Sequence, residues 1–213
     1  MTFIFDFDGT LVDSMPTYSR KMLSLLDELK LEYPTDIIKT LTPLGDRGAA
    51  ELFVKMGAKK NVEELIARMN ELAYDGYAHH VPAKPHVAET LKKLRNAGHS
   101  LNVLTASPHQ LLDVCLKRLG LYDLFENVWS CDDFSTTKAN PEIYIEAAKK
   151  LGVPVYKCTF LDDNLNADTA AKKSGIGVIG VYDESSAEYE ADIRAVCDGY
   201  IRDFSELEAV CGL

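Results

Sequence analysis

The sequence has no close pair of cysteines, no long apolar run and no excess of basic residues. Its five cysteines form an odd, widely spaced set: Cys115, Cys131, Cys158, Cys197 and Cys211. A disulfide framework or a zinc knuckle needs cysteines in even number or at short spacing, so neither is predicted. The thiols are expected to be buried and reduced, as in a cytoplasmic protein.

No segment approaches the roughly 20 uncharged apolar residues that a membrane-spanning helix needs. The first residues also lack the basic region and apolar run of a secretory leader. We therefore expect neither a membrane span nor export.

The balance of charge excludes another group of functions. The 33 acidic residues outnumber the 23 basic ones, and the formal net charge is -10. This field repels nucleic acid and anionic lipid, so a general nucleic-acid binder is not expected. The same field repels small anionic substrates, and a phosphate-handling site would need a local cation to reverse it.

The chain of 213 residues suggests one main domain with a smaller insert. Residues 2–7 are a short apolar run typical of a buried strand. Residues 14–81 then show helical spacing of apolar side chains, which predicts a bundle of some four helices. The sequence has no internal repeat and no linker rich in Pro, Gly or Ser. The domain boundaries are therefore predicted where the spacing of apolar residues changes.

After residue 82 helices and strands alternate, which is the signature of a parallel sheet covered by helices. The expected helices span 85–97, 108–119, 141–151, 165–174 and 186–195. The expected strands span 100–105, 127–131, 157–162 and 176–181, with a short one near 200–201. Because a lone strand cannot satisfy its backbone, residues 2–7 must join this sheet. The prediction is an α/β, Rossmann-like core of residues 1–13 and 82–213, with residues 14–81 inserted after the first strand.

Polar residues follow several of these strands, and ligands of a parallel sheet collect at the carboxyl ends of its strands. They are Asp6 to Thr10 after the first strand, Thr105 to Ser107 after the second, Asp162, Asp163 and Asp168 after the strand 157–162, and Lys138 in a loop. Taken singly, each is more often a cap, a turn residue or a solvated charge. Gathered at one edge, however, the carboxylates would repel one another unless a cation lay among them. Mg²⁺, which prefers carboxylates, water and phosphate as ligands, fits this requirement.

These motifs resemble those of the haloacid dehalogenase superfamily, in its branch of phosphoglycolate phosphatases and sugar-phosphate mutases. The segment Asp6-Phe7-Asp8-Gly9-Thr10 is similar to the first motif of the family. The other motifs follow in order: Thr105, Lys138 before Pro141-Glu142-Ile143-Tyr144, and the acidic cluster before Ala170-Ala171-Lys172. The resemblance covers the whole chain and identifies residues 14–81 with the helical cap domain of the family.

The resemblance implies a Mg²⁺-dependent phosphatase that acts on a small phosphomonoester through an aspartyl-phosphate. Asp6 would be the nucleophile, and Asp8 would protonate the leaving alcohol and later deprotonate water. Thr105 and Lys138 would stabilise the transition state.

The resemblance also assigns the ligands. The metal would be held by Asp6, the backbone carbonyl of Asp8 and Asp163, with Asp162 and Asp168 as supporting groups. The remaining phosphate contacts would come from Gly9, Thr10, Ala106 and Ser107. Two departures from the family pattern are Ala139-Asn140, where relatives often have Lys-Pro, and Asp162, where relatives usually have Gly.

The cap should supply selectivity, because the sheet edge meets only the phosphate. Residues 42–48 break the helical pattern and resemble a substrate-facing loop, in which Arg47 could bind a substrate anion. An equally good interpretation is a solvated arginine at a helix start, paired with a neighbouring acid. The expected partner is a small phosphorylated metabolite, not nucleic acid or membrane, and a monomer or weak dimer is expected.

Two alternatives stay open. A mutase shares the first motif but usually has His twelve positions after the nucleophile, where this chain has Tyr18. A catalytically idle binding module would be expected to lack Asp6, Asp8 or Lys138, and all three are present.

Overall fold

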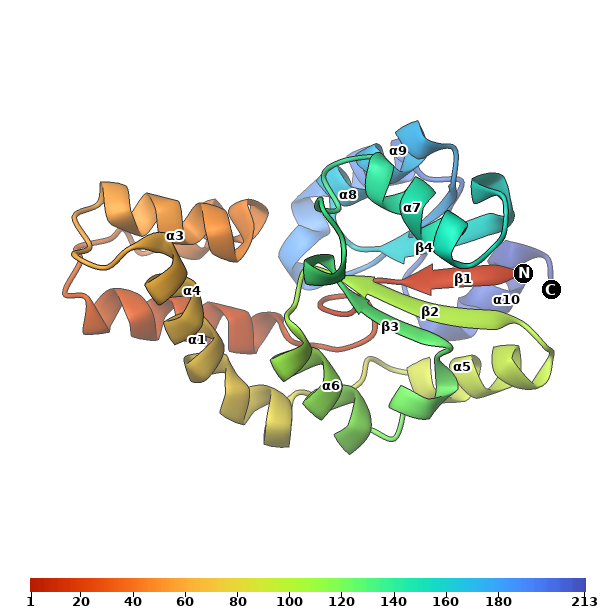
Figure 1. Ribbon diagram of the computed structural model, residues 1–213, viewed down its shortest axis with the longest axis horizontal. Helices are drawn as coiled ribbons and strands as arrows, with labels where there is room; N and C mark the ends of the chain where they lie inside the picture. The colour runs from red at the N-terminus through yellow and green to blue at the C-terminus, as the bar shows by residue number, and fades with distance from the viewer. The chain divides into compact units, whose positions relative to one another are not determined.

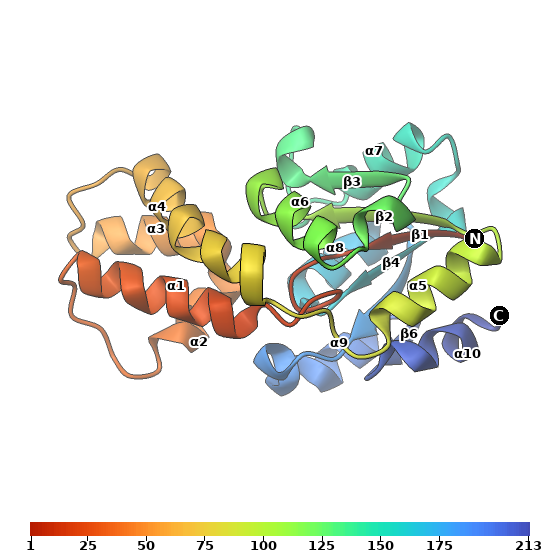
Figure 2. The same cartoon turned by 90° about the horizontal axis from the view of Figure 1, so that it is seen from below.

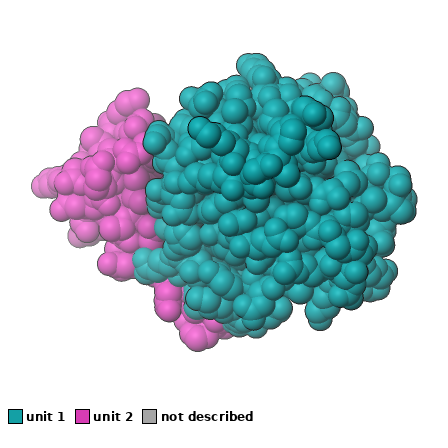
Figure 3. All heavy atoms as spheres, turned by 45° about the vertical axis from the view of Figure 1, so that its right-hand side comes forward, with its two compact units in different colours: residues 1–13, 82–213 teal, residues 14–81 magenta. Residues whose placement is uncertain are grey.

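The computed structural model describes the backbone of all 213 residues and every side chain except that of Pro43. The chain divides into two compact units, one of residues 1–13 and 82–213 and the other of residues 14–81 (Figure 3). No helix within the described chain is both long enough and apolar enough to cross a membrane.

The larger unit is built on a six-stranded parallel sheet with the strand order β3-β2-β1-β4-β5-β6. Its strands are β1 (Thr2–Phe5), β2 (Ser100–Thr105), β3 (Asn127–Ser130), β4 (Cys158–Asp162), β5 (Gly177–Val181) and β6 (Gly199–Ile201). Strand β1 pairs with β2 on one side and β4 on the other, and Phe5 is in register with both Val103 and Leu161. The carboxyl ends of these three strands therefore meet at one edge. The predicted α/β fold with a parallel Rossmann-like sheet is confirmed.

Helices cover both faces of this sheet (Figures 1 and 2). One face carries α7 (Glu142–Lys150), α8 (Leu165–Ser174) and α9 (Glu190–Val196), and the other carries α5 (Val87–Asn96), α6 (His109–Arg118) and α10 (Leu207–Cys211). The alternation of side chains along β1 explains both layers. Ile4 packs into the cluster that contains Tyr144 and Phe160, whereas the Phe5 ring meets Phe125 and Phe204. A strand buried on both faces must be apolar throughout, as β1 is.

The smaller unit contains four α-helices: α1 (Met15–Glu28), α2 (Ile37–Leu41), α3 (Gly45–Lys55) and α4 (Val62–Asp75). Their apolar faces form a separate core that includes Met22, Leu26, Phe53 and Leu65. A π-helical turn, Gly76–His80, follows α4. The unit thus has its own buried cluster, as an independent packing unit requires.

Residues 42–48 differ from the sequence prediction, because they are helical rather than a loop. Thr42–Leu44 form a 3-10 turn and Gly45 opens α3. Gly45 has a φ of 64°, a left-handed conformation that costs glycine little. The glycine changes the direction of the backbone between two helical segments, and this change of direction interrupts the periodic pattern.

Smaller differences lie near the C-terminus. The predicted helix 186–195 is a 3-10 segment, Glu184–Tyr189, followed by α9. The last helix, α10, was not predicted because five residues are too few for a helical period to be recognised.

Candidate active site

A lysine joins two carboxylates at the carboxyl edge of the sheet. Lys138 Nζ lies 2.6 Å from Asp6 Oδ1 and donates a hydrogen bond to Asp162 Oδ2 at 2.7 Å. Asp6 follows β1, Asp162 ends β4, and both side chains are buried. Residues 6 and 162 are distant in the sequence, and the central pairing of β1 with β4 brings them together, while Lys138 reaches both from the segment before α7.

Burial and neighbouring charge perturb this group strongly. Burial raises the pKa of Asp6 to about 7; Lys138 opposes the rise and Asp162 adds to it. Burial by itself would lower the pKa of Lys138, but Asp162 and Asp6 hold it well above its ordinary value. Lys138 is therefore a permanent cation and the counter-ion of the two carboxylates.

The backbone that carries Lys138 is anchored in the core. The buried Tyr144 hydroxyl donates to the Lys138 carbonyl oxygen at 2.8 Å and lies 3.1 Å from the Ala167 carbonyl oxygen. Asn140 Oδ1 accepts the backbone N–H of Glu142 at 3.0 Å. The lysine is thus positioned although Ala139-Asn140 replaces the Lys-Pro of relatives.

Asp163 lies against the turn that follows β1. Thr10 Oγ1 donates to Asp163 Oδ1 at 3.0 Å. Gly9 has a φ of 77°, and a Cβ atom at this position would lie 2.5 Å from Asp163 Oδ2. Burial, followed by the charges of Asp162 and Asp6, holds the pKa of Asp163 well above its usual range. The left-handed conformation favours glycine here, and any side chain would have to displace the Asp163 carboxylate.

Asp8 contacts the turn that follows β2. Ser107 Oγ donates a short hydrogen bond to Asp8 Oδ2, and the Ser107 N–H donates to Thr105 Oγ1 at 3.1 Å. Thr105 is buried, whereas Ala106 between them is exposed. The structure thus gathers Asp6, Asp8, Thr105, Lys138 and Asp163 at one edge of the sheet.

Three carboxylates could hold a divalent cation. One oxygen of each of Asp6, Asp162 and Asp163 lies within 4.8 Å of the others. Asp6 Oδ1 is buried, and the Lys138 ammonium, 2.6 Å away, is in position to donate to it. Both Asp162 oxygens have partners, since Oδ2 binds Lys138 and Oδ1 accepts the Asn164 N–H at 2.8 Å. Asp6 and Asp163 are therefore better suited than Asp162 to hold Mg²⁺.

Asp168 lies outside this group of three. It is on α8 and fully buried, and the Cys197 thiol acts on it as a hydrogen-bond donor. Burial and then Asp162 raise its pKa well above the usual range, while the Cys197 thiol lowers it. Its predicted supporting role at the metal stays a prediction.

A second buried ion pair was missed by the sequence analysis. Lys84 Nζ lies 2.8 Å from Asp183 Oδ2 and donates to the Tyr182 carbonyl oxygen at 2.6 Å. Among the charges that act on the pKa of Asp163, Asp183 raises it and Lys84 lowers it. Asp183 follows β5, so the rule applied to the other strands could have identified it, whereas Lys84 carries no such signal.

Arg47 belongs to the other unit. Its guanidinium is 66% exposed and lies 3.6 Å from Glu63 Oε1. It is in the first turn of α3, as the solvated alternative describes. A role in binding substrate stays a prediction.

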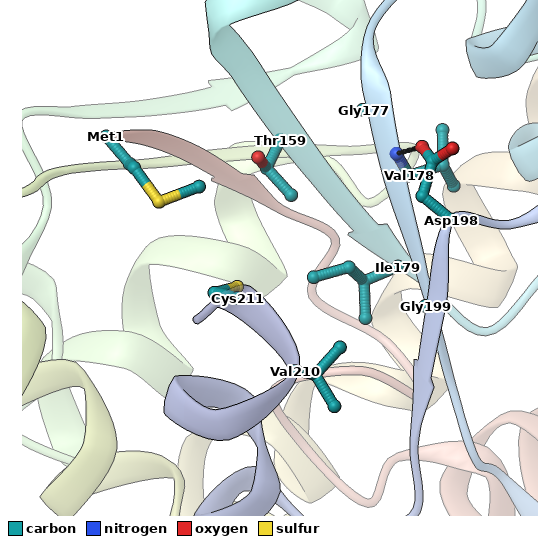
Figure 4. Close-up of a pocket in the computed structure, with 9 residues that line it drawn as sticks. All are labelled: Met1, Thr159, Gly177, Val178, Ile179, Asp198, Gly199, Val210 and Cys211. Atoms are coloured by element: carbon teal, nitrogen blue, oxygen red, sulfur yellow. Dashed lines mark hydrogen bonds between the residues drawn. The ribbon is translucent and has the colours of Figure 1, made fainter. Parts of the chain in front are cut away.

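A cavity of about 160 Å³ lies at the opposite edge of the sheet (Figure 4). Thr159, Gly177 and Gly199, near the starts of β4, β5 and β6, line it. The other lining residues are Met1, Val178, Ile179, Asp198, Val210 and Cys211. It is separate from the acidic cluster, which lies where the strands end.

Comparisons with known proteins agree with the motifs. Residues 3–181 match the haloacid dehalogenase-like hydrolase family. The chain is 28% identical over 200 residues to a phosphoglycolate phosphatase of Psychrobacter arcticus, which covers 90% of this chain and 86% of that protein. It is also 28% identical over 214 residues to hexitol phosphatase B of Escherichia coli K12, covering 97% and 93%.

A solved structure has the same fold. The CbbY protein of Rhodobacter sphaeroides, in complex with phosphate, superposes with a TM-score of 0.87 at 22% identity, covering 100% of this chain and 99% of that one. Together with the family match over residues 3–181, this confirms the predicted resemblance. The chain therefore belongs to the haloacid dehalogenase-like hydrolase family and is an enzyme whose named relatives are phosphatases.

Proposed function

We propose that this protein is a Mg²⁺-dependent phosphatase that hydrolyses a small phosphomonoester through a phosphorylated Asp6. The observation that carries the proposal is the position of Asp6, 2.6 Å from Lys138 and grouped with Asp163 at the carboxyl edge of the sheet. This arrangement gives a carboxylate nucleophile a neighbouring cation. The cation offsets the repulsion between two anions that would otherwise oppose attack on a phosphate.

The proposed reaction has two displacements at phosphorus. An Asp6 oxygen forms a bond to phosphorus while the bond to the ester oxygen breaks, and Asp8 gives its proton to the leaving alcohol. Asp8 then takes a proton from water, whose oxygen attacks the same phosphorus and releases Asp6 and inorganic phosphate. The hydrogen bond from Ser107 to Asp8 supports this role, because it orients the carboxyl that must act twice.

The bound ion would be held by Asp6, the backbone carbonyl of Asp8 and Asp163. Mg²⁺ at this position would neutralise charge on the transferred phosphoryl group. Thr105, Lys138 and the turns at 9–10 and 106–107 would bind the phosphoryl oxygens. The hydrogen bond from Thr10 to Asp163 supports this assignment by orienting that carboxylate.

Hydrolysis is favoured over phosphoryl transfer by the environment of Tyr18. Its hydroxyl donates to the Leu41 carbonyl oxygen at 3.1 Å, and burial raises its pKa above an already high value. A phenol held in this way cannot shuttle protons near neutral pH, as the histidine of a mutase would. The relatives named for phosphoglycolate and hexitol phosphates suggest small phosphorylated carbohydrates or acids as substrates.

We place this activity in the cytoplasm, where a reducing environment suits five free cysteines. The physiological partner would be a small phosphorylated metabolite. Because the chain has a net charge of -10, binding of an anionic substrate would depend on a local cation, and the buried Lys138 is placed to supply it.

The proposal is tested by phosphate release from p-nitrophenyl phosphate and from a panel of phosphorylated sugars, polyols and hydroxy acids. We expect turnover with Mg²⁺ and none in excess chelator. The Asp6→Asn variant should lose several orders of magnitude while keeping its circular dichroism spectrum. Appreciable turnover by Asp6→Asn would contradict the covalent mechanism.

The choice between hydrolysis and transfer is tested with the two anomers of glucose 1-phosphate. We expect free phosphate as the main product from either anomer that reacts. Conversion of the beta anomer to glucose 6-phosphate faster than phosphate release would favour a mutase instead.

A further inference from the structure

His109 lies between two carboxylates that come from different elements. Its Nδ1 is 3.0 Å from Asp113 Oδ1, one helical turn along α6, and its Nε2 is 2.8 Å from Asp133 Oδ2. A neutral imidazole has a single N–H, and carboxylates only accept hydrogen bonds. Both contacts can be hydrogen bonds to carboxylates only if the ring carries two protons. The geometry is that of an imidazolium clamp.

The clamp joins two turns at the carboxyl edge of the sheet. His109 is the first residue of α6, and only Pro108 separates it from Ser107, which donates to Asp8. Asp133 ends the turn Cys131–Asp133, and its Oδ2 also accepts the N–H of Ser130, the last residue of β3. The ring therefore ties the turn after β2 to the start of the segment that leads to Lys138.

The proline makes this link stiff. Pro108 has a φ of -70°, held by its ring, so a movement of His109 passes to Ser107 with few torsions to absorb it. The backbone N–H of Ser107 is itself bonded to Thr105 Oγ1. The positions of Ser107 and Thr105, which we assign to phosphate binding, thus depend on where His109 is held. The orientation of Asp8 depends on it too, through its hydrogen bond from Ser107.

The charges around the ring favour its cationic form. Hydrogen bonding to Asp113 raises the pKa of His109, partial burial opposes the rise, and hydrogen bonding to Asp133 adds to it. The position at a helix N-terminus disfavours a cation, but the two carboxylates outweigh it. The other charged groups at this site are Lys117, 3.9 Å from Asp113, and Lys150 of α7, which donates to the Asp133 carbonyl oxygen.

We propose that His109 is a positioning residue whose imidazolium orients Ser107 on Asp8 by clamping the turn after β2 to the turn after β3. This role rests on the proposed phosphatase function. The clamp holds below the pKa of His109 and is lost as the pH rises through that value, because the neutral ring keeps one donor. Turnover should therefore decline on the alkaline side as the clamp opens, and the loss should affect kcat more than KM.

Three variants separate charge from shape. His109→Gln removes the cation and should lower kcat roughly threefold to tenfold at pH 6, with no alkaline decline that depends on this residue. His109→Arg keeps a permanent cation with several donors and should retain kcat within about twofold, with the decline moved to higher pH. His80→Gln is the matched control, since His80 is 67% exposed beside Asp75, and should behave as wild type. A His109→Gln enzyme with the wild-type kcat and pH profile would overturn the proposal, as would a His109→Arg enzyme no better than His109→Gln.

A measurement that needs no turnover distinguishes failure of the clamp from failure of the phosphatase assignment. The pKa of His109 is measured by NMR in the wild type and in Asp133→Asn, whose amide oxygen can still accept the Ser130 N–H. We expect a lower pKa in the variant. An unchanged pKa would refute the clamp even in an active phosphatase, whereas a lowered pKa in a protein that releases no phosphate would refute the phosphatase assignment alone.

Discussion

Among single residues, Lys138 compensates the charge of the buried carboxylates Asp6 and Asp162 at the carboxyl edge of the sheet. It is the cation nearest to both Asp6 and Asp162, which are 5% and 0% exposed. Two buried carboxylates whose oxygens lie within 4.8 Å of one another could not both ionise without such a counter-ion, because their repulsion adds to the loss of hydration. The lysine that neutralises these carboxylates is therefore also in a position to bind a phosphate group.

Replacing Lys138 by methionine should show both effects. We expect turnover to fall by about a hundredfold or more, because transition-state charge loses its main compensation. The free energy of unfolding in chelator should fall by about 3–5 kcal/mol, since two buried charges lose their partner. Urea unfolding and phosphate release measure the two effects. Lys138→Arg, which keeps the charge, should be affected less in both assays, and a Lys138→Met enzyme with wild-type turnover would contradict this reading.

Asp168 illustrates the opposite situation, a buried carboxyl with little compensation. Because its pKa in the folded protein lies above the unfolded value, the folded state binds the proton more tightly. Stability should therefore fall as the pH rises from about 4, the unfolded value, towards the folded value.

Asp168→Asn should accordingly stabilise the protein at pH 7, by roughly 1–3 kcal/mol, or about 3–10 °C in melting temperature. The gain should shrink as the pH approaches 4. Differential scanning calorimetry in chelator measures it. The control is Asp198→Asn, because Asp198 accepts from Lys172 at 2.6 Å and from the Val178 N–H at 2.9 Å, and its loss should destabilise. A lower melting temperature for Asp168→Asn would mean that its carboxylate is well solvated or paired.

Among the secondary-structure elements, the groups that we assign to catalysis come from the turns that follow β1, β2 and β4 and from the segment between β3 and α7. Parallel pairing places these turns at one edge, and each is tightened by its own hydrogen bonds, such as Gly9 N–H to the Val12 carbonyl oxygen at 3.0 Å. The turn after β1 approaches Asp163 so closely that a side chain at Gly9 would have to displace the Asp163 carboxylate. Element geometry thus controls where a metal ligand can lie.

Gly9→Ala tests this close approach. The left-handed φ costs alanine about 1 kcal/mol, and the new methyl group must displace the Asp163 carboxylate. We expect loss of Mg²⁺-dependent turnover of more than tenfold, a rough value for a misplaced ligand group. Gly120→Ala is a matched control, since Gly120 has a φ of 66° with no atom within 4 Å of the added Cβ in the described chain. It should show the strain in melting temperature and keep its activity; equal activity in both variants would refute the steric argument.

At the scale of the whole molecule, two units with separate cores share one chain, and the catalytic groups that we assign to phosphate chemistry belong to the unit of residues 1–13 and 82–213. The net charge of -10 adds a repulsive field to the local repulsion at the acidic edge. A bound divalent cation should therefore stabilise the fold as well as serve the reaction.

Magnesium should raise the melting temperature of the wild type. At a hundredfold excess over its dissociation constant, an ion that binds only the folded state adds about 2.7 kcal/mol. Asp163→Asn should abolish most of this shift. Potassium chloride at equal ionic strength is the control, because general screening needs no specific site. A shift of equal size in potassium chloride would refute a specific cation site.

Much of the fold could be predicted because it is written in local patterns. The apolar run of β1, the alternation after residue 82 and the helical spacing of residues 14–81 each depend on neighbours in sequence. The motif at Asp6 to Thr10 and the carboxyl-end rule also located most of the candidate site. The prediction of a loop at residues 42–48 was wrong, because a glycine that redirects a helix and a glycine that ends one look alike in sequence.

The class of fold, the order of its elements and the residue types at the ends of the strands could thus be inferred from the amino-acid sequence without the structure. Which of these residues contact one another depends on the three-dimensional packing of the chain. Lys138 reaches Asp6 and Asp162, Asp133 reaches His109, and Asp168 lies outside the group of three carboxylates, although it is only five positions from Asp163. These outcomes depend on strand order and on the direction of each side chain from its helix. Neither leaves a periodic trace in sequence, because contacts between distant segments are selected by the packing of the whole core.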